Sequence, residues 1–331
     1  MTSDKRYAKI PKRKIRDGLE LTEVGLGTWA IGGPWKYGWG AQDDDQSRRS
    51  ILRALDEGVN WIDTAPAYGL GHAEELVGAV LAESPGRRND IIIATKCGIV
   101  WDSQKNVSFS IAPADIRREC EDSLRRLKID CIDLYQIHWP DSKTPIVESW
   151  AEMMKLKKEG KVKNIGVCNF DMNLLKKCQK LGEISTLQPP YSMLKREIEK
   201  EIMPWCKTNG VGILAYSPMQ AGLLTGKFNK EYVAGLADGD WRKRNPMFQD
   251  PFLSKALAFV DEIRNIGAGY KIDLAAFAVA WVLAHEEVTS AIVGVRNESQ
   301  ATAIAHGAGI RIGDDDMKKI NEIYGKIFGN L

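Results

Sequence analysis

Short apolar runs rich in β-branched residues recur along the chain, and between them lie segments with apolar residues at helical spacing and charged residues on the opposite side. Such runs are typical of strands that are buried on both faces of a parallel sheet. The predicted strands are residues 23–27, 60–63, 91–96, 132–138, 164–167, 184–188, 211–216 and 290–293. This alternation predicts right-handed βαβ units, and eight such units can close into a barrel.

The segments that follow the strands carry the start and stop signals of helices. The predicted helices are residues 46–57, 73–82, 114–127, 146–158, 172–180, 198–207, 252–266 and 274–284. Their starts are marked by Pro113, Pro145 and Asp171, and their ends by Gly58, Gly160 and Gly210.

Two segments lie outside this alternation. Residues 13–21 carry an Asp17-Gly18 turn between extended residues, which predicts a hairpin that could plug the barrel floor. Residues 217–251 are rich in Gly, Lys, Asn and Asp and predict a long loop, and long loops in compact domains are usually functional. We therefore expect one domain over residues 1–331, a (β/α)8 TIM barrel with an N-terminal hairpin and long βα loops at its C-terminal face.

The composition is that of an ordinary globular protein. Of 331 residues, 44% are hydrophobic, and 46 Lys and Arg against 44 Asp and Glu give a net charge of +2. This balance leaves no large basic field for phosphates and argues against nucleic acid as a partner. The longest apolar run, residues 274–284, has 11 residues where a bilayer needs about 20, so it predicts a buried helix and no membrane association.

The cysteines indicate the compartment. None of the six lies in a C-x-x-C pair or at ligand spacing from a histidine, which disfavours a disulfide framework and a metal site. The basic first 16 residues are not followed by the apolar stretch of a secretory signal. We expect a reducing compartment, the cytoplasm.

Two glycine motifs resemble nucleotide-binding fingerprints but lack the required context. The pattern G-x-G-x-x-A at residues 25–30 follows a predicted strand, yet residues 32–34 (Gly-Gly-Pro) prevent the helix that has to hold a pyrophosphate. Residues 222–227 resemble a P-loop, but three residues separate the glycines where four are needed, and Phe228 replaces the magnesium-binding hydroxyl residue. We reject both a Rossmann site and a Walker motif.

Polar residues at the carboxyl ends of the predicted strands are the candidates for chemistry, because (β/α)8 barrels place their active sites there. Asp63, Lys96 and His138 end three consecutive strands, and Tyr68 follows Asp63 by five residues. Each type has an ordinary alternative role as a turn cap, a solvated lysine, a core histidine or a rim aromatic. Their convergence favours a single site.

These four residue types suit proton transfer to a carbonyl oxygen. A buried Lys96 should favour the phenolate and lower the pKa of Tyr68 from about 10 toward that of a usable general acid. Asp63 can supply the counter-charge for the ammonium group. His138 can donate a hydrogen bond that orients a substrate carbonyl. The set can protonate an alkoxide as hydride reaches its carbon.

Further motifs fall at the same strand ends: Gly27-Thr28-Trp29, Asp63-Thr64-Ala65-x-x-Tyr68-Gly69, Thr95-Lys96, Asp133-Leu134-Tyr135-Gln136-x-His138, Ile165-Gly166-Val167-x-Asn169-Phe170, Gln188-x-x-Tyr191, Tyr216-Ser217-Pro218 and Gly294-x-Arg296. With them the chain resembles the aldo-keto reductases, NAD(P)H-dependent (β/α)8 barrels, and among these the longer-chain bacterial type related to potassium-channel β subunits. The resemblance implies a catalytic tetrad with Tyr68 as the acid in reduction, and NADPH or NADP as cofactor, with NADH possible. The implied tetrad is Asp63, Tyr68, Lys96 and His138.

The resemblance also implies a cofactor that lies extended across the barrel mouth. Asn169 and Gln188 would hold its carboxamide, and Tyr216, which could otherwise be a rim aromatic, would stack on the nicotinamide. Residues 217–251 would cover the cofactor, with residues 217–227 folded over the pyrophosphate. The other implied contacts are Thr28, Trp29, Asp63, Ser217, Pro218, Leu223, Thr225, Lys227 and Gly294.

Residues 294–300 combine a cation with the backbone donors of a helix start, which is a natural phosphate site. The resemblance makes it the site of a 2′-phosphate, so Arg296 with Gln300 favours NADPH over NADH. Glu298 would repel that phosphate if it faced inward.

Two positions depart from the family pattern. Cys168 stands where the family usually has Ser, which weakens one polar cofactor contact. Ile304 stands where longer-chain members commonly carry Asn for the adenine, so the adenine end is held more loosely or NADPH selectivity is reduced.

The expected substrate side of the mouth is rich in tryptophan. Aromatic faces suit sugars and small aldehydes equally, and no cationic pair awaits a dicarboxylate. We expect a small aldehyde, ketone, α-dicarbonyl, polyol or aldose as substrate, and a monomer or weak homo-oligomer. The expected lining is Trp29, Tyr68, Trp101, His138 and Trp139, with Trp35, Tyr37, Trp39 and Trp241 near them.

Two other functions fit the same motifs. Potassium-channel β subunits share the fold yet act mainly as binding partners, so a cofactor-binding regulatory protein without significant turnover is the main alternative. A sugar isomerase or dehydratase with the same tetrad would use no net nicotinamide. The intact tetrad and the lack of an obvious docking appendage favour a reductase.

Overall fold

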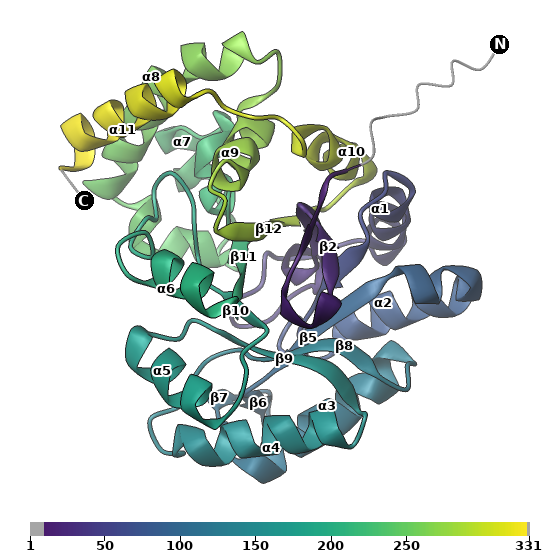
Figure 1. The fold of residues 1–331 in the computed structure, drawn as a ribbon. Coiled ribbons are helices and arrows are strands. Elements are labelled where there is room, and N and C mark those ends of the chain that lie inside the picture. Colours follow the sequence, from purple (N-terminus) through teal and green to yellow (C-terminus); the bar gives the residue numbers. More distant parts are fainter. Residues whose placement is uncertain (1–9, 330–331) are drawn as a thin grey trace.

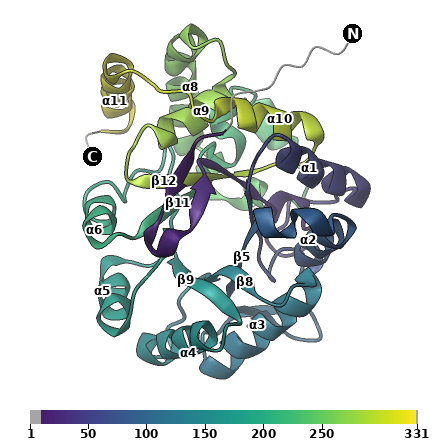
Figure 2. The same cartoon turned by 45° about the vertical axis from the view of Figure 1, so that its right-hand side comes forward.

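Eight parallel strands form a closed barrel at the centre of the protein, seen in a computed structural model that describes residues 10–329 (Figures 1 and 2). Their order around the barrel is β3, β4, β5, β8, β9, β10, β11 and β12, and β12 pairs with β3 to close it. All eight coincide with predicted strands to within a few residues, so the predicted (β/α)8 barrel is confirmed. The strands are β3 (Val24–Gly27), β4 (Trp61–Asp63), β5 (Ile92–Cys97), β8 (Ile132–Ile137), β9 (Val162–Cys168), β10 (Thr186–Gln188), β11 (Gly212–Tyr216) and β12 (Val288–Gly294).

Helices surround the barrel, as Figure 2 shows. They are α1 (Asp44–Asp56), α2 (His72–Glu83), α3 (Pro113–Leu127), α4 (Ile146–Lys158), α5 (Met172–Leu181), α6 (Ile202–Asn209), α8 (Phe252–Gly269), α9 (Leu274–Leu283), α10 (Glu298–Gly307) and α11 (Asp314–Phe328). The predicted helix starts and ends are confirmed. Asp171 caps α5 by accepting the Leu174 N–H at 2.8 Å. Gly58, Gly160 and Gly210, which were predicted to end helices, all have positive φ. The helix predicted from residue 198 begins only at Ile202, because Arg196 and Glu199 pair in a turn before it.

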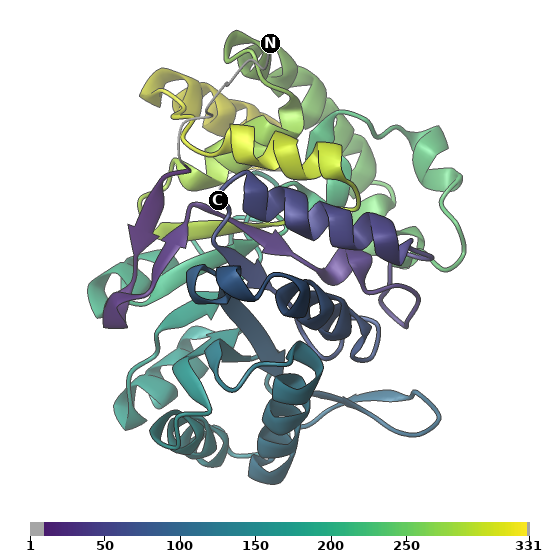
Figure 3. The same cartoon turned by 90° about the vertical axis from the view of Figure 1, so that its right-hand side faces the viewer.

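The N-terminal hairpin closes one end of the barrel, as predicted. It consists of β1 (Lys12–Lys14) and β2 (Glu20–Thr22), joined by the short helix η1 (Arg16–Gly18). Leu21 is fully buried and packs with Trp61, Leu134 and other residues of the barrel interior. In Figure 3 this purple hairpin lies at one end of the barrel, and the blue hairpin β6–β7 (Ile99–Trp101, Val107–Phe109) projects from the opposite end.

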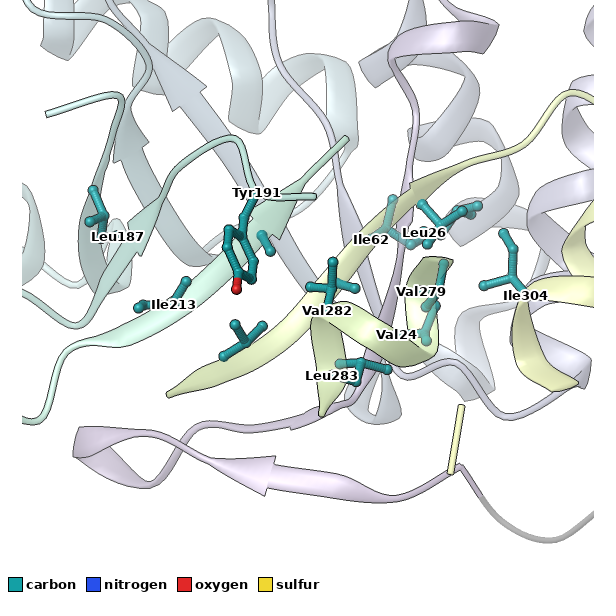
Figure 4. Packing of buried hydrophobic residues seen from close by; sticks show 14 of the residues in the cluster. Val24, Leu26, Ile62, Leu187, Tyr191, Ile213, Val279, Val282, Leu283 and Ile304 are labelled. Carbon is teal, nitrogen blue, oxygen red and sulfur yellow. The ribbon is translucent and has the colours of Figure 1, made fainter. Parts of the chain in front are cut away.

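Most of the core lies between the outer face of the barrel and the helices. Figure 4 shows Val24, Leu26 and Ile62 of the strands facing Val279 of α9 and Ile304 of α10. Every described residue of α9 except Ala275 is buried, so the apolar run in this region is a core helix, as predicted. No single helix within residues 10–329 is long and apolar enough to cross a membrane; α8 and α9 meet the length and composition criteria only together and are bent by 85°.

The segment that follows β11 differs from the long loop predicted for residues 217–251. It contains short helical elements because Asn229, Asp240 and Asn245 each cap a turn by accepting a backbone N–H. The elements are η4 (Gln220–Thr225), α7 (Lys230–Ala234), η5 (Trp241–Arg244) and η6 (Pro246–Phe248).

Gly25 is required by the packing of the barrel interior rather than by a nucleotide. A Cβ at Gly25 would lie 2.0 Å from Cε2 of Trp61 on the neighbouring strand. Trp61 is fully buried, and its Nε1 lies 3.2 Å from the Thr22 carbonyl oxygen and 3.1 Å from Ser290 Oγ. Gly25 therefore makes room for an indole inside the barrel.

We expect Gly25→Ala to lower the free energy of unfolding by about 3 kcal/mol, because a buried ring and the barrel backbone have to shift to admit the methyl group. Gly86→Ala is the matched control, since nothing lies within 4 Å of a Cβ at that position. Thermal unfolding followed by circular dichroism compares the two variants. Equal Tm values would contradict the tight packing of Trp61 on Gly25.

Candidate active site

The structure brings together the four polar side chains predicted to share a site at the carboxyl ends of the strands. Lys96 of β5 is fully buried, and its ammonium group contacts Asp63 at the end of β4, with Nζ 2.8 Å from Oδ1 and 2.7 Å from Oδ2. The same group donates to the Thr64 carbonyl oxygen at 2.9 Å and lies 3.2 Å from the Tyr68 hydroxyl. Lys96 therefore joins the carboxylate and the phenol in one hydrogen-bonded unit.

Lys96 is charged in this unit. Burial lowers the pKa of Lys96, but the negative charge of Asp63 and the Tyr68 oxygen raise it further, so the pKa lies above its ordinary value. An ammonium group without water needs this compensation, because a buried charge is costly unless it is paired.

The prediction that the pKa of Tyr68 is lowered is wrong. Burial raises the pKa of Tyr68 above its ordinary value, and the opposing effect of Lys96 is smaller. Only 8% of the Tyr68 surface is exposed, and this desolvation disfavours the charged phenolate. At neutral pH the Tyr68 hydroxyl therefore carries its proton, which it can donate, while its oxygen accepts the hydrogen bond from Lys96.

His138 follows β8 and faces Tyr68 edge-on, with 5.8 Å between the ring centroids. Its backbone N–H donates to the Cys97 carbonyl oxygen at 2.8 Å, which fixes it beside β5. Burial, and then the charge of Lys96, lower the pKa of His138 well below its ordinary value, so the imidazole is neutral. Its Nδ1 is buried and has no hydrogen-bond partner among the described residues.

Two amide side chains expected to hold a carboxamide also lie at this end. Gln188 Nε2 donates to Asp63 Oδ1 at 2.8 Å, and Gln188 Oε1 accepts no hydrogen bond from the described residues. Asn169 Nδ2 donates to the His138 carbonyl oxygen at 2.9 Å, and Asn169 Oδ1 accepts the Tyr216 hydroxyl at 2.9 Å. Amides can donate and accept further bonds, so this set fits the donor and acceptor of a carboxamide.

The backbone beside these amides is strained. Asn169 and Ser217, the first residues after β9 and β11, have φ values of 58° and 55°, which residues with a Cβ rarely adopt. Thr28 Oγ1 donates to the Asp63 carbonyl oxygen at 3.0 Å and ties β3 to the same centre. Cys168 is fully buried, and burial raises the pKa of its thiol, so it contributes a neutral, weakly polar wall.

In the segment expected to cover the pyrophosphate, only some side chains are available to contact a ligand. Leu223 is fully buried in the core, so a contact from this residue would come from its backbone. Thr225 Oγ1 donates to the Gly222 carbonyl oxygen at 2.7 Å, and Lys227 is exposed. Ser217 and Tyr216 are half-buried, and Pro218 is buried.

The phosphate site predicted at residues 294–300 forms the start of α10. Arg296 Nε donates to Gln42 Oε1 at 2.7 Å, and Gln300 Oε1 accepts the Arg296 N–H at 2.8 Å. Glu298 pairs with Arg49 of α1 at 3.3 Å, so its charge is partly compensated. The contacts of Gln42 and Arg49 with this site could not be predicted from the sequence, because their proximity to α10 arises only from the packing of α1 on α10.

Ile304 lies one helical turn further along α10 and is 8% exposed within the core. Its side chain packs among apolar side chains, so it offers no polar group to a ligand.

Aromatic rings form one wall of the mouth. Trp29 stacks on Tyr68 with 6.5 Å between ring centroids and on Trp241 with 5.2 Å. Trp39 meets the edges of Trp29 at 5.3 Å and of Trp241 at 5.8 Å. Trp139 is 41% exposed, and Trp101 lies on the hairpin β6–β7.

Trp241 reaches this wall because its neighbour Arg242 is anchored. Arg242 is buried, binds Asp240 at 2.6 Å, and has its guanidinium carbon 4.6 Å from the centroid of Trp39. The centroid of the Phe228 ring lies 5.5 Å from the same guanidinium carbon. The sequence placed Trp241 near the mouth but missed this anchor, which depends on tertiary packing.

The comparisons with known proteins agree on one family. The sequence profile of the Aldo/keto reductase family matches residues 23–325. Aldo-keto reductase YhdN of Bacillus subtilis is 39% identical over 308 residues, which are 92% of this chain and 91% of YhdN. An NADH-specific methylglyoxal reductase of Escherichia coli is 35% identical over 318 residues, which are 92% of this chain and 95% of that protein.

Solved structures agree in fold and length. The glycerol dehydrogenase AKR11B4 from Gluconobacter oxydans superposes with a TM-score of 0.87 at 40% identity, covering 97% of each chain. An aldo/keto reductase from Klebsiella pneumoniae in complex with NADP and acetate gives a TM-score of 0.71 at 26% identity, covering 98% of this chain and 97% of its own.

We expect His138 to stay neutral from pH 8 down to about pH 6, because its pKa lies well below the ordinary 6.5. Long-range proton–nitrogen NMR spectra across this range test it, with the His138 signal assigned by its loss in His138→Gln. An imidazolium signal for His138 at pH 6.5 would contradict the assigned environment. Because protonation then favours the unfolded chain, the contribution of His138 to stability is lost as pH falls below about 6.5.

Proposed function

The chain belongs to the aldo/keto reductase family, and from this membership we propose that it reduces a small carbonyl compound to an alcohol, or catalyses the reverse oxidation, with NADPH as its preferred cofactor. NAD(P)H-dependent carbonyl reduction is the activity of this family. The observation that carries the assignment of the site is the buried unit of Lys96, Asp63 and the Tyr68 hydroxyl.

When bound, the nicotinamide supplies or accepts the hydride. Tyr68 is the general acid in reduction, and its hydroxyl proton passes to the carbonyl oxygen as that oxygen gains negative charge. Lys96, 3.2 Å from the Tyr68 oxygen, stabilises the phenolate that remains. Asp63 holds the ammonium group in place with both carboxylate oxygens.

His138 orients the substrate. A neutral imidazole at the edge of Tyr68 can donate a hydrogen bond to the same carbonyl oxygen that Tyr68 protonates. Its unpartnered nitrogen is a buried polar atom that a ligand would satisfy. A neutral ring is also preferable here, because a second positive charge beside Lys96 would be repelled.

We propose that Asn169 and Gln188 hold the carboxamide of the cofactor and that Tyr216 supports the ring. Gln188 Oε1 is available as an acceptor, and the strained backbone at Asn169 and Ser217 marks both positions as shaped for a ligand. Residues 217–251 would cover the cofactor, with Ser217, Pro218, Leu223, Thr225 and Lys227 along it. The remaining proposed contacts are Thr28, Trp29, Asp63, Gly294, Arg296 and Gln300.

The preference for NADPH depends on Arg296 at the start of α10. A guanidinium group and the helix N-terminus together suit a phosphate, and Arg49 offsets the charge of Glu298. One relative is NADH-specific and one related structure holds NADP, so the family fold accommodates both cofactors.

For the substrate we propose a small aldehyde, ketone, α-dicarbonyl, polyol or aldose bound beside Trp29, Trp101 and Trp139. Relatives named for methylglyoxal and glycerol support compounds of this size. We also propose a reducing compartment such as the cytoplasm, because all six cysteines, which lie within residues 10–329, are free thiols.

We expect Tyr68→Phe to lower kcat by at least about 100-fold, because the general acid is lost while the ring remains. The Kd of NADPH, measured by fluorescence titration, should change less than about twofold. Turnover is followed by NADPH oxidation with a panel of aldehydes, ketoses and dicarbonyls. Tyr324→Phe, on the outer helix α11, is the control. Normal turnover in Tyr68→Phe would refute the role, and tight cofactor binding by the unaltered protein without turnover on any compound would favour a regulatory cofactor-binding protein.

We expect Arg296→Ala to raise the Kd of NADPH about tenfold and that of NADH less than about twofold, because only NADPH carries the 2′-phosphate. Fluorescence titration with each cofactor measures both constants. Arg87→Ala removes the same charge at a distant exposed ion pair and is the control. Equal weakening of both cofactors would place the 2′-phosphate elsewhere.

A further inference from the structure

A cavity lies at the same end of the barrel as the proposed reaction centre. It is a cavity of about 410 Å³ formed by residues 34–36, 69–70 and the hairpin residues 101–103, 105 and 107. These segments follow β3, β4 and β5, so the cavity opens at the same end of the barrel as Asp63 and Lys96. We call it the mouth cavity.

The mouth cavity adjoins Tyr68. Gly69 and Leu70 of its wall directly follow Tyr68 in the chain. Trp35 and Val107 of its wall also pack on the apolar cluster that contains Tyr68. Because the mouth cavity shares this wall with the segment that carries Tyr68, it is the place where the far end of an elongated substrate would lie.

Two lysines line this cavity. Lys36 and Lys105 have exposed side chains, and within residues 10–329 neither ammonium group makes a hydrogen bond or an ion pair. The Lys36 ammonium lies 5.3 Å from the centroid of the Tyr37 ring. The two lysines are far apart in the sequence, which is why the sequence indicated no cationic pair near the substrate.

The acidic residue of the wall is already engaged. Asp102 Oδ1 accepts the N–H groups of Gln104 and Asn106, each at 2.9 Å, and its Oδ2 accepts Asn106 Nδ2 at 2.9 Å. These bonds hold the turn of the hairpin β6–β7 and lower the pKa of Asp102. The mouth cavity thus offers two unpaired cations against one carboxylate that is bound by its own turn.

We propose that the mouth cavity binds the anionic tail, a phosphate or a carboxylate, of the carbonyl substrate. The proposal rests on the reductase function proposed above and narrows its substrate class. A phosphate ester carries a charge of about −1.5 to −2 at neutral pH, which matches two ammonium groups. The indoles of Trp35 and Trp101 in the same wall can cover the carbon atoms that link the anion to the carbonyl.

The experiment compares substrates that differ in charge. With saturating NADPH, kcat/KM is measured for glyceraldehyde and glyceraldehyde 3-phosphate, and for butanal and succinic semialdehyde, so that phosphate and carboxylate are tested separately. We expect the anionic member of at least one pair to be favoured by about fivefold or more, mainly through KM. The preference should shrink as salt is raised from about 0.05 to 0.5 M, because exposed charges are screened.

The variant Lys36→Gln with Lys105→Gln should abolish this preference and leave the neutral substrates within about twofold. The matched control is Lys176→Gln with Lys326→Gln, which removes two exposed charges from α5 and α11 and should retain the preference. Equal kcat/KM for charged and neutral substrates in the unaltered protein, or a preference that survives in the double variant, overturns the proposal.

Binding without turnover separates this proposal from the proposed function. Calorimetry with NADP-saturated protein measures the binding of glycerol 3-phosphate, with glycerol as the neutral comparison. At least fivefold weaker binding of glycerol 3-phosphate to the double variant supports the mouth cavity even if no carbonyl compound is reduced. Equal binding to both proteins overturns the inference, and reduction of neutral aldehydes would then still support the reductase.

Discussion

The buried ion pair between Lys96 and Asp63 is the interaction on which the rest of the site depends. Removing one partner of such a pair typically costs about 3–5 kcal/mol, because the other charge is left without compensation. The pair forms only because β4 and β5 are in register, with Asp63 opposite Ala94. From this fixed point Lys96 reaches Thr64 and Tyr68, so the position of the phenol follows from the pairing of two strands.

The layers on either side of β5 keep this strand in place. On the inner side, Trp61 and Leu21 fill the barrel beneath the site, and Gly25 leaves room for the indole. On the outer side, Thr95 donates to the buried Glu74 at 2.5 Å, and Glu74 also binds Arg126 of α3 at 2.7 Å. Lys96 is thus flanked by packing on one face and by a charged network on the other, which preorganises it.

The sequence predicts this architecture well where local patterns decide it. Buried parallel strands give continuous β-branched runs, and the polar residue that ends each run marks the mouth, which is how Asp63, Lys96 and His138 could be found. The hairpin β6–β7 and the helix α11 were missed, because neither is part of the strand–helix alternation. The pKa of Tyr68 was predicted in the wrong direction, because the desolvation of the phenol depends on packing that no short motif records.

The aromatic wall links the two halves of the mouth. Trp241 belongs to the segment proposed to cover the cofactor, whereas Trp29 follows strand β3 and stacks on Tyr68. Arg242 holds this segment against Trp39, and Ser192 Oγ donates to Gln220 Oε1 at 2.7 Å at its other end. Trp241 therefore shapes the substrate side of the mouth but belongs to the segment that would cover the cofactor. Movement of this segment would change the substrate side and the cofactor side together.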